Sequence, residues 1–472
     1  MTNVLAFDFG ASSGRAVLGS FDGERISYIE VSRFENVPVR DGKRLAWDYF
    51  AIVDEIKRTI DRYPDVDAIA FDTWGVDYGL IDHQNKLVSL PTNYRDKRTS
   101  RVPEKLFKKI SPQDLYKATG NQIMDINTLF QLLTEDGERL NAESMLFMPD
   151  LFAWSLCGSR TVERTIASTS QMIDPITGDW NRVITAFTPF KDNFFPQIVG
   201  SATVCGIYKG IPVVKAAGHD TQCAVAAMPC APGTEAAFLS CGTWSLIGCE
   251  LDEPILTEKS MTDELSNEIG ANGKINYLKN ISGLWLIQEI RRNFRREGKE
   301  YSYNDMEQLA RKEPAYTCFI DPDDPEFSVS GDICGKIRAY CSRTGQDVPG
   351  TDGALVRCIY ESLAMKYRYA IRQIQENTGK QFAVLHLLGG GTKDNFLCQM
   401  TADVLEFPVI AGPTEATALG NIVLQLIALG RIPDVAAGRE MIRKTEKVTV
   451  YYPNSVDALD EKYNAFCHAI QK

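Results

Sequence analysis

A carboxylate, Asp220, follows Gly218-His219 at the point where a helix is predicted to begin. The preceding run 211–217 is typical of a buried strand, and 222–227 has a helical pattern. Because a helix N-terminus favours negative charge, Asp220 could stay ionised and accept a proton from a substrate hydroxyl that attacks a phosphoryl group. A helix N-cap is the structural alternative, and on this segment alone it is the simpler interpretation.

A turn of small residues follows the first predicted strand, residues 4–9. Its backbone N–H groups and the hydroxyls of Ser12 and Ser13 can donate hydrogen bonds to phosphate oxygens, and Arg15 adds positive charge. Asp8, near the end of the strand, could hold a hydrated Mg²⁺ ion. A tight hairpin with an aspartate in its first strand would have the same sequence. The candidate phosphate-binding residues are Ala11, Ser12, Ser13, Gly14 and Arg15.

Two further turns could bind an anion. Gly242-Thr243 separates two strand-like runs, although an ordinary hairpin is the simpler interpretation of it alone. Two such turns facing one another would clamp a polyphosphate. Gly389-Gly390-Gly391 follows the predicted strand 382–388 and precedes a helix, so its backbone can pass close to a ligand. A flexible loop is the alternative, but three consecutive glycines cost conformational entropy, which favours a binding role.

A polar and aromatic group, residues 72–77, ends the predicted strand 68–71. Carboxylates such as Asp77 accept hydrogen bonds from hydroxyls, and the indole of Trp74 can cover an apolar face. The group therefore suits a sugar, with a strand-end turn and a core tryptophan as the alternative.

The net charge and the absence of certain motifs and of long apolar runs exclude several classes of protein. Neither a Gly-x₄-Gly-Lys-Ser/Thr loop nor a Gly-x-Gly-x-x-Gly turn after a strand is present. The net charge of −11 argues against a nucleic-acid partner, and no run of about 18 apolar residues points to a membrane. Because the N-terminus has no secretory pattern, we expect a cytoplasmic protein.

The 12 cysteines do not follow the pattern of a structural zinc site, because no Cys-x-x-Cys pair occurs and there are only four histidines. We expect reduced, mostly buried thiols that act as small apolar residues. Cys334 and Cys341 could cross-link if oxidised.

The chain is predicted to consist of two large halves. A length of 472 residues alone suggests about three domains, and 44% hydrophobic residues indicate a globular protein. The strand-turn-strand pattern of 6–14 recurs at 237–245, and Pro229–Gly233 lies between the two. We therefore predict halves of 1–233 and 234–472 with a cleft between them. The last helix could pack back on the first half.

The order of these segments resembles the FGGY family of carbohydrate kinases over nearly the whole chain. Gly218 and Cys241 stand where the family favours serine, and Gln222 replaces a small residue, which leaves the fine shape of a sugar pocket open. The resemblance is carried by 8–15, Asp72-Thr73-Trp74-Gly75-Val76-Asp77, 93–99, Met148-Pro149-Asp150, His219-Asp220-Thr221, Ser240-Cys241-Gly242-Thr243-Trp244-Ser245-Leu246, 278–286 and Gly389-Gly390-Gly391.

The resemblance implies an α/β fold of two actin-like (ribonuclease-H-like) domains with ATP and a sugar in the interdomain cleft. It implies ATP-dependent phosphorylation of a 6-deoxyketose, L-rhamnulose, to its 1-phosphate, with Asp220 as the general base. The alternatives are a kinase for L-fuculose or another ketose, and, in a different class, a non-catalytic actin-like regulator that binds ATP or sugar. Monomer and homodimer are both compatible with the sequence.

Carried over residue by residue, the resemblance also implies the binding groups. Asp8 would help to position Mg²⁺. The sugar would contact Gly75, Asp77, His219, Thr221 and Asn280. ATP would contact Ala11, Ser12, Ser13, Gly14, Arg15, Thr243, Gln288, Gly389, Gly390 and Gly391.

Overall fold

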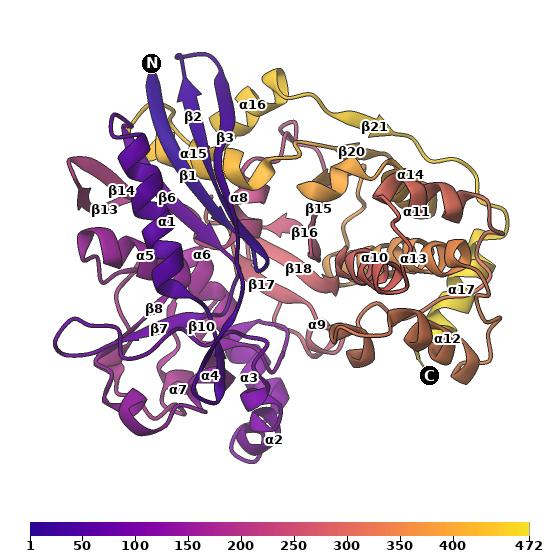
Figure 1. Cartoon of the computed structure of the whole chain (residues 1–472), viewed down its shortest axis with the longest axis horizontal. Helices are drawn as coiled ribbons and strands as arrows, with labels where there is room; N and C mark the ends of the chain where they lie inside the picture. Colours follow the sequence, from indigo (N-terminus) through magenta and orange to yellow (C-terminus); the bar gives the residue numbers. More distant parts are fainter. Residues whose placement is uncertain (472) are drawn as a thin grey trace. The chain divides into compact units, whose positions relative to one another are not determined.

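The computed structural model describes residues 1–471 (Figure 1). These residues divide into two compact units. Unit 1 contains Met1–Ala231, Glu250–Tyr277 and Glu415–Glu446. Unit 2 contains Pro232–Cys249, Leu278–Thr414 and the described residues from Lys447 onward. Over the described chain, none of the helices combines the length and apolar character needed to cross a membrane.

A six-stranded sheet with the order β13-β14-β6-β1-β2-β3 forms the centre of unit 1. Its middle strands β1 and β6 are parallel and almost wholly buried, which explains their near-continuous apolar sequences. β1 also pairs antiparallel with β2, so the predicted opening hairpin is present. The sheet strands are β1 (Thr2–Phe9), β2 (Ser13–Phe21), β3 (Ile26–Glu35), β6 (Ala68–Thr73), β13 (Thr203–Tyr208) and β14 (Ile211–Lys215).

Helices with one apolar face pack on this sheet. In α1, Ile52, Ile56 and Ile60 recur at helical spacing and are buried in the core, while the Asp48 carboxylate caps the first turn. α5 packs against β6 and β14. The helices of unit 1 are α1 (Tyr49–Arg62), α2 (Val102–Leu106), α3 (Pro112–Thr119), α4 (Thr128–Leu132), α5 (Met148–Cys157), α6 (Arg164–Ala167), α7 (Arg182–Thr185), α8 (Asp220–Ala226), α9 (Glu258–Thr262), α15 (Ala416–Ala428) and α16 (Val435–Thr445).

Shorter strands complete unit 1 outside the main sheet. They are β4 (Val39–Asp41), β5 (Arg44–Ala46), β7 (Tyr78–Ile81), β8 (Ser144–Phe147), β9 (Val162–Glu163), β10 (Ile173–Asp174), β11 (Asp179–Trp180), β12 (Ile198–Val199) and β17 (Ser266–Ile269).

A late segment of the chain, α15 and α16, belongs to unit 1. The Asn421 side chain donates to Asp72 Oδ2 at 2.7 Å, and Gln425 donates to the Leu5 carbonyl at 3.2 Å. A Cβ at Gly420 would lie 1.8 Å from the Cys223 carbonyl oxygen, so α15 approaches α8 as closely as it does only because this residue is glycine. The division therefore differs from halves of 1–233 and 234–472, and the last helix, α17 (Leu459–Ile470), belongs to unit 2.

The sheet of unit 2 repeats the pattern that opens unit 1. β15 pairs antiparallel with β16 and parallel with β19, as β1 does with β2 and β6. β20 then continues the parallel part, and β21 pairs with it antiparallel. The prediction of two α/β domains of similar build is confirmed. The strands are β15 (Ala236–Cys241), β19 (Val384–Leu388), β20 (Val409–Ala411) and β21 (Thr449–Tyr451), while β16 (Trp244–Leu251) and β18 (Ile275–Ser282) run through unit boundaries.

A long helix, α13, lies at the centre of the helical part of unit 2. It runs from the Thr351 cap to Gly379, whose φ of 70° ends it in the left-handed conformation. Most of its residues are buried, because α10, α11, α14 and α17 all contact it. The helices of unit 2 are α10 (Trp285–Arg296), α11 (Tyr303–Arg311), α12 (Ile333–Arg343), α13 (Asp352–Thr378), α14 (Asn395–Leu405) and α17.

Candidate active site

The candidate base Asp220 is the first residue of α8, and the N-cap position is occupied by His219. Asp220 Oδ1 accepts hydrogen bonds from the Thr221 backbone N–H at 2.6 Å and from its hydroxyl at 3.3 Å. Burial raises the pKa of Asp220, His219 opposes the shift and the neighbouring Asp8 carboxylate adds to it, and the net result is a pKa of about 6. Because the Asp220 side chain is 32% exposed, a ligand can reach its carboxyl group.

His219 joins Asp220 to a second carboxylate that the sequence did not single out. Its Nδ1 lies 2.9 Å from Glu268 Oε2, and its Nε2 lies 3.4 Å from Asp220 Oδ1. Burial alone would lower the pKa of His219, but the Glu268 carboxylate, together with Asp220 and Glu163, raises it above the usual value. Glu268, on β17, also accepts a hydrogen bond from Gln222 at 2.7 Å. The ring is therefore held between two carboxylates.

Asp8 and Arg15 are opposite each other on β1 and β2. Arg15 donates to Asp8 Oδ2 through Nε at 2.9 Å and Nη2 at 2.7 Å, and it also pairs with Glu415 just before α15. Burial opposes the charge of Arg15, but Asp8 and Glu415 raise its pKa above the usual value. In this structure the guanidinium group thus holds Asp8 in place.

Asp72 lies beside Asp8 in the parallel register of β6 with β1. Its side chain is fully buried, and burial followed by repulsion from Asp8 raises its pKa well above the usual range. Oδ1 is buried with no hydrogen-bond partner in the described part of the chain. Oxygen ligands suit Mg²⁺, so Asp8 and the unsatisfied oxygen of Asp72 fit a hydrated magnesium ion.

The small-residue turn after β1 is a closed hairpin. The Gly10 N–H donates to the Ser13 carbonyl at 2.8 Å, and Ser12 is exposed while Ala11 and Ser13 are half-buried. A Cβ at Gly14 would lie 2.4 Å from the ring of Phe34, so only glycine fits there. The turn presents its tip to solvent, as a phosphate-binding loop requires.

Asp77 of the expected sugar group lies in the interior. Its Oδ2 accepts from the indole N–H groups of Trp47 at 2.7 Å and Trp74 at 3.0 Å, and from the Tyr94 backbone N–H at 3.1 Å. Oδ1 accepts from Gln131 at 3.0 Å. These donors make Asp77 the centre of a polar network that holds Trp74 in place. To bind the sugar as well, the Asp77 carboxylate would have to accept hydrogen bonds from sugar hydroxyls in addition to those of this network.

Gly75 and Thr221 complete the expected sugar residues of unit 1. A Cβ at Gly75 would lie 3.2 Å from the Thr169 side chain, so the chain passes close to that residue. Thr221 is buried next to the base. The fifth expected residue, Asn280, is half-buried on β18 in unit 2.

Three of the expected ATP-binding elements are neighbours within unit 2. The Thr243 carbonyl accepts from the N–H groups of Gly283 at 3.1 Å and Trp285 at 3.2 Å, where α10 begins. Gln288 lies one turn further along α10. A Cβ at Gly391 would lie 2.3 Å from Cys241 Sγ, so the triple-glycine turn packs against the end of β15.

Comparison with known proteins agrees with the fold. The model of the N-terminal domain of the FGGY family of carbohydrate kinases matches residues 3–228, and the model of its C-terminal domain matches 237–429. These matches show that the protein is a sugar phosphotransferase that uses ATP. The chain belongs to the FGGY family of carbohydrate kinases, as the resemblance predicted.

Two relatives are similar over nearly their full length. The chain is 37% identical over 488 residues to a protein of Bacteroides thetaiotaomicron named rhamnulokinase, covering 99% of both chains. It is 36% identical over 482 residues to an Enterococcus faecalis protein with the same name, covering 98% of this chain and 97% of that protein.

Two solved structures share the fold. A ligand-bound xylulose kinase from Lactobacillus acidophilus superposes with a TM-score of 0.80 at 15% identity, covering 99% of this chain and 97% of that one. Plasmodium falciparum glycerol kinase with ADP also gives 0.80 at 15% identity, covering 100% and 98%.

Proposed function

We propose that the protein transfers the γ-phosphoryl group of ATP to the 1-hydroxyl of L-rhamnulose, with Asp220 as the general base. The observation that carries the proposal is the position of Asp220 at the start of α8, with Oδ1 held by Thr221 and a pKa raised to about 6. Two full-length relatives named rhamnulokinase support the choice of sugar.

A carboxyl group with this pKa is well placed for proton transfer. It is mostly ionised at neutral pH and yet basic enough to take the proton that the sugar hydroxyl loses as it attacks phosphorus. The bond from the 1-oxygen to phosphorus forms as the bond from phosphorus to the β,γ-bridging oxygen breaks, and ADP leaves. General-base help of this kind contributes about 10²- to 10⁴-fold to the rate.

The other candidate residues bind either the sugar or the nucleotide. Glu268 orients His219, which in turn positions Asp220. The sugar contacts are made by His219, Gly75, Thr221 and Asn280. Asp77 holds the indole of Trp74 in place. The turns at 11–14, Thr243, Gln288 and 389–391 donate to ATP.

Asp8 and Asp72 would hold Mg²⁺, and Arg15 fixes Asp8. The ion, when bound, neutralises negative charge on the polyphosphate. Because Arg15 already faces two carboxylates, its contribution to phosphate binding is secondary to holding Asp8.

A substrate panel tests the proposal. ADP release is measured with L-rhamnulose, L-fuculose, L-xylulose and L-ribulose, and phosphorus NMR identifies the position of the new ester. We expect the highest kcat/KM for L-rhamnulose and a 1-phosphate product. Preference for another ketose would replace the sugar assignment, and binding of ATP or sugar without any ADP release would point to a regulator.

A further inference from the structure

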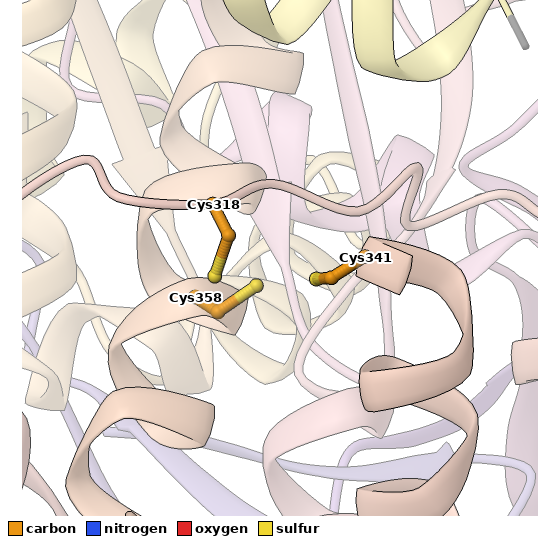
Figure 2. Close-up of side chains that lie close together, drawn as sticks. All are labelled: Cys318, Cys341 and Cys358. Atoms are coloured by element: carbon orange, nitrogen blue, oxygen red, sulfur yellow. The ribbon is translucent and has the colours of Figure 1, made fainter. Parts of the chain in front are cut away.

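Three cysteines from distant parts of the sequence converge inside unit 2 (Figure 2). Cys318 comes from the segment between α11 and the 3₁₀-helix η5 (Pro325–Ser328), Cys341 from α12 and Cys358 from α13. Their three Sγ atoms all lie within 4.8 Å of one another. Each residue is at most 2% exposed.

The segment that carries Cys318 is anchored on both sides of the thiol. The Tyr316 N–H donates to Glu361 at 2.7 Å, the Phe319 N–H to Gln346 at 2.7 Å and the Ile320 N–H to Ser362 at 2.9 Å. The bonds to Glu361 and Ser362 hold this irregular segment against α13, and the bond to Gln346 ties it to the turn that follows α12. The three thiols are therefore preorganised, which lowers the entropic cost of binding a ligand between them.

We propose that Cys318, Cys341 and Cys358 form a binding site for one thiophilic d¹⁰ metal ion, Zn²⁺ or Cu(I). Thiolate sulfur selects these ions, whereas the hard ions Mg²⁺ and Ca²⁺ require oxygen ligands. Two sulfurs bound to one ion by bonds of about 2.3 Å are roughly 3.8 Å apart in tetrahedral geometry, within the 4.8 Å limit observed here.

Binding needs neither an oxidant nor a reductant. Each thiol that becomes a ligand gives its proton to solvent, and a metal–sulfur bond takes the place of the S–H bond.

A metal ion at this position would tie three segments of unit 2 together. α13 supplies one of the ligands, and two turns further on its Tyr367 hydroxyl is hydrogen-bonded to Ser245 at 2.8 Å, close to the Thr243 turn. We therefore expect the metal to raise the thermal stability of the protein rather than to take part in phosphoryl transfer.

The test uses the reduced full chain after removal of metals with a chelator. Zn²⁺ and, without oxygen, Cu(I) are titrated separately against a chromophoric competitor, and Cd²⁺ is added to read sulfur-to-metal charge transfer in the ultraviolet. We expect one equivalent of Zn²⁺ or Cu(I) per chain, release of protons, a higher midpoint of thermal unfolding and a thiolate band with Cd²⁺. Whichever of Zn²⁺ and Cu(I) binds more tightly is assigned as the ion of this site.

Cysteine variants supply the control. Cys341→Ser should weaken binding by at least about 100-fold, since even indirect partners of a metal site change affinity by 10- to 100-fold. Cys334→Ser removes a buried thiol two turns away on α12 and should bind like the wild type.

Two results would overturn the proposal. One is wild-type protein that binds neither ion and shows no thiolate band with Cd²⁺, a result that does not depend on the folding of any variant. The other is a disulfide among the three cysteines in protein isolated with its thiols trapped. Neither result bears on the sugar kinase activity.

Discussion

His219 Nδ1 lies 2.9 Å from Glu268 Oε2, although the two residues are 49 positions apart in the sequence. The other nitrogen of the ring lies 3.4 Å from Asp220 Oδ1. Glu268 thereby fixes the orientation of the imidazole and raises its pKa, so that a charged histidine can face the candidate base.

Glu268→Gln should lower kcat/KM and move its acidic limb to higher pH. Without the carboxylate, the pKa of His219 falls and the ring becomes neutral at a lower pH. A neutral ring no longer lowers the pKa of Asp220, which therefore rises. The measurement is the pH profile of kcat/KM beside that of Glu258→Gln, an exposed glutamate in the first turn of α9. An unshifted profile with uniformly lower activity would mean that Glu268 has only a structural role.

Asp220→Asn should reduce kcat by about 10²- to 10⁴-fold, the usual contribution of a general base. In the wild type, kcat/KM should fall as the pH drops through about 6, because the base becomes protonated. The variant should lose this limb. Near-normal turnover in the folded variant would refute the assignment.

The same substitution should stabilise the fold at neutral pH. The folded-state pKa of about 6 exceeds the ordinary value of 3.8, so the folded protein gives up this proton less readily than the unfolded chain. The stability that Asp220 costs therefore builds up as the pH rises from 3.8 to about 6 and is complete above pH 6, and Asn removes that cost. Thermal unfolding should show a higher midpoint than the wild type at pH 8 and no difference below pH 3.8. Asp65→Asn, at an exposed position, serves as the control.

Gly391→Ala and Gly390→Ala should behave differently although they are neighbours. A Cβ at Gly391 would meet Cys241 Sγ at 2.3 Å, whereas one at Gly390 would meet nothing within 4 Å. We expect Gly391→Ala to lower the midpoint of thermal unfolding and raise the KM for ATP. Gly390→Ala should keep the wild-type midpoint and raise only the KM for ATP. An unchanged KM for ATP in Gly390→Ala would show that the turn does not contact the nucleotide.

Asp77→Asn should lower the free energy of unfolding by about 1–3 kcal/mol, since an amide NH₂ would face N–H donors in a buried site. The indole N–H groups of Trp47 and Trp74 would both lose the charged acceptor of their hydrogen bonds. Urea denaturation measures the loss, with Asp65→Asn as the control. A higher KM for the sugar with unchanged stability would instead assign Asp77 to direct recognition.

The sequence by itself determined the local elements and their chemistry. Apolar runs ending in small or acidic residues predicted the hairpin after Asp8, the corresponding turn at Thr243 and the helix that begins near Asp220. Such features depend on backbone preferences and on the burial of neighbouring residues, both of which a short segment encodes. The repetition of one hairpin in each half likewise predicted two halves of similar build, and the resemblance to the FGGY family implied that both are α/β domains.

Tertiary structure alone decided which distant residues meet. Neither the pairing of Glu268 with His219 nor the contact of Glu415 with Arg15 has a spacing that a local motif would reveal. The cysteine spacings argued against a metal site, yet packing brings Cys318, Cys341 and Cys358 together. The physical reason is common to all three cases: such contacts arise from helices and strands packing to bury apolar faces, and that packing joins side chains without regard to their separation in the chain.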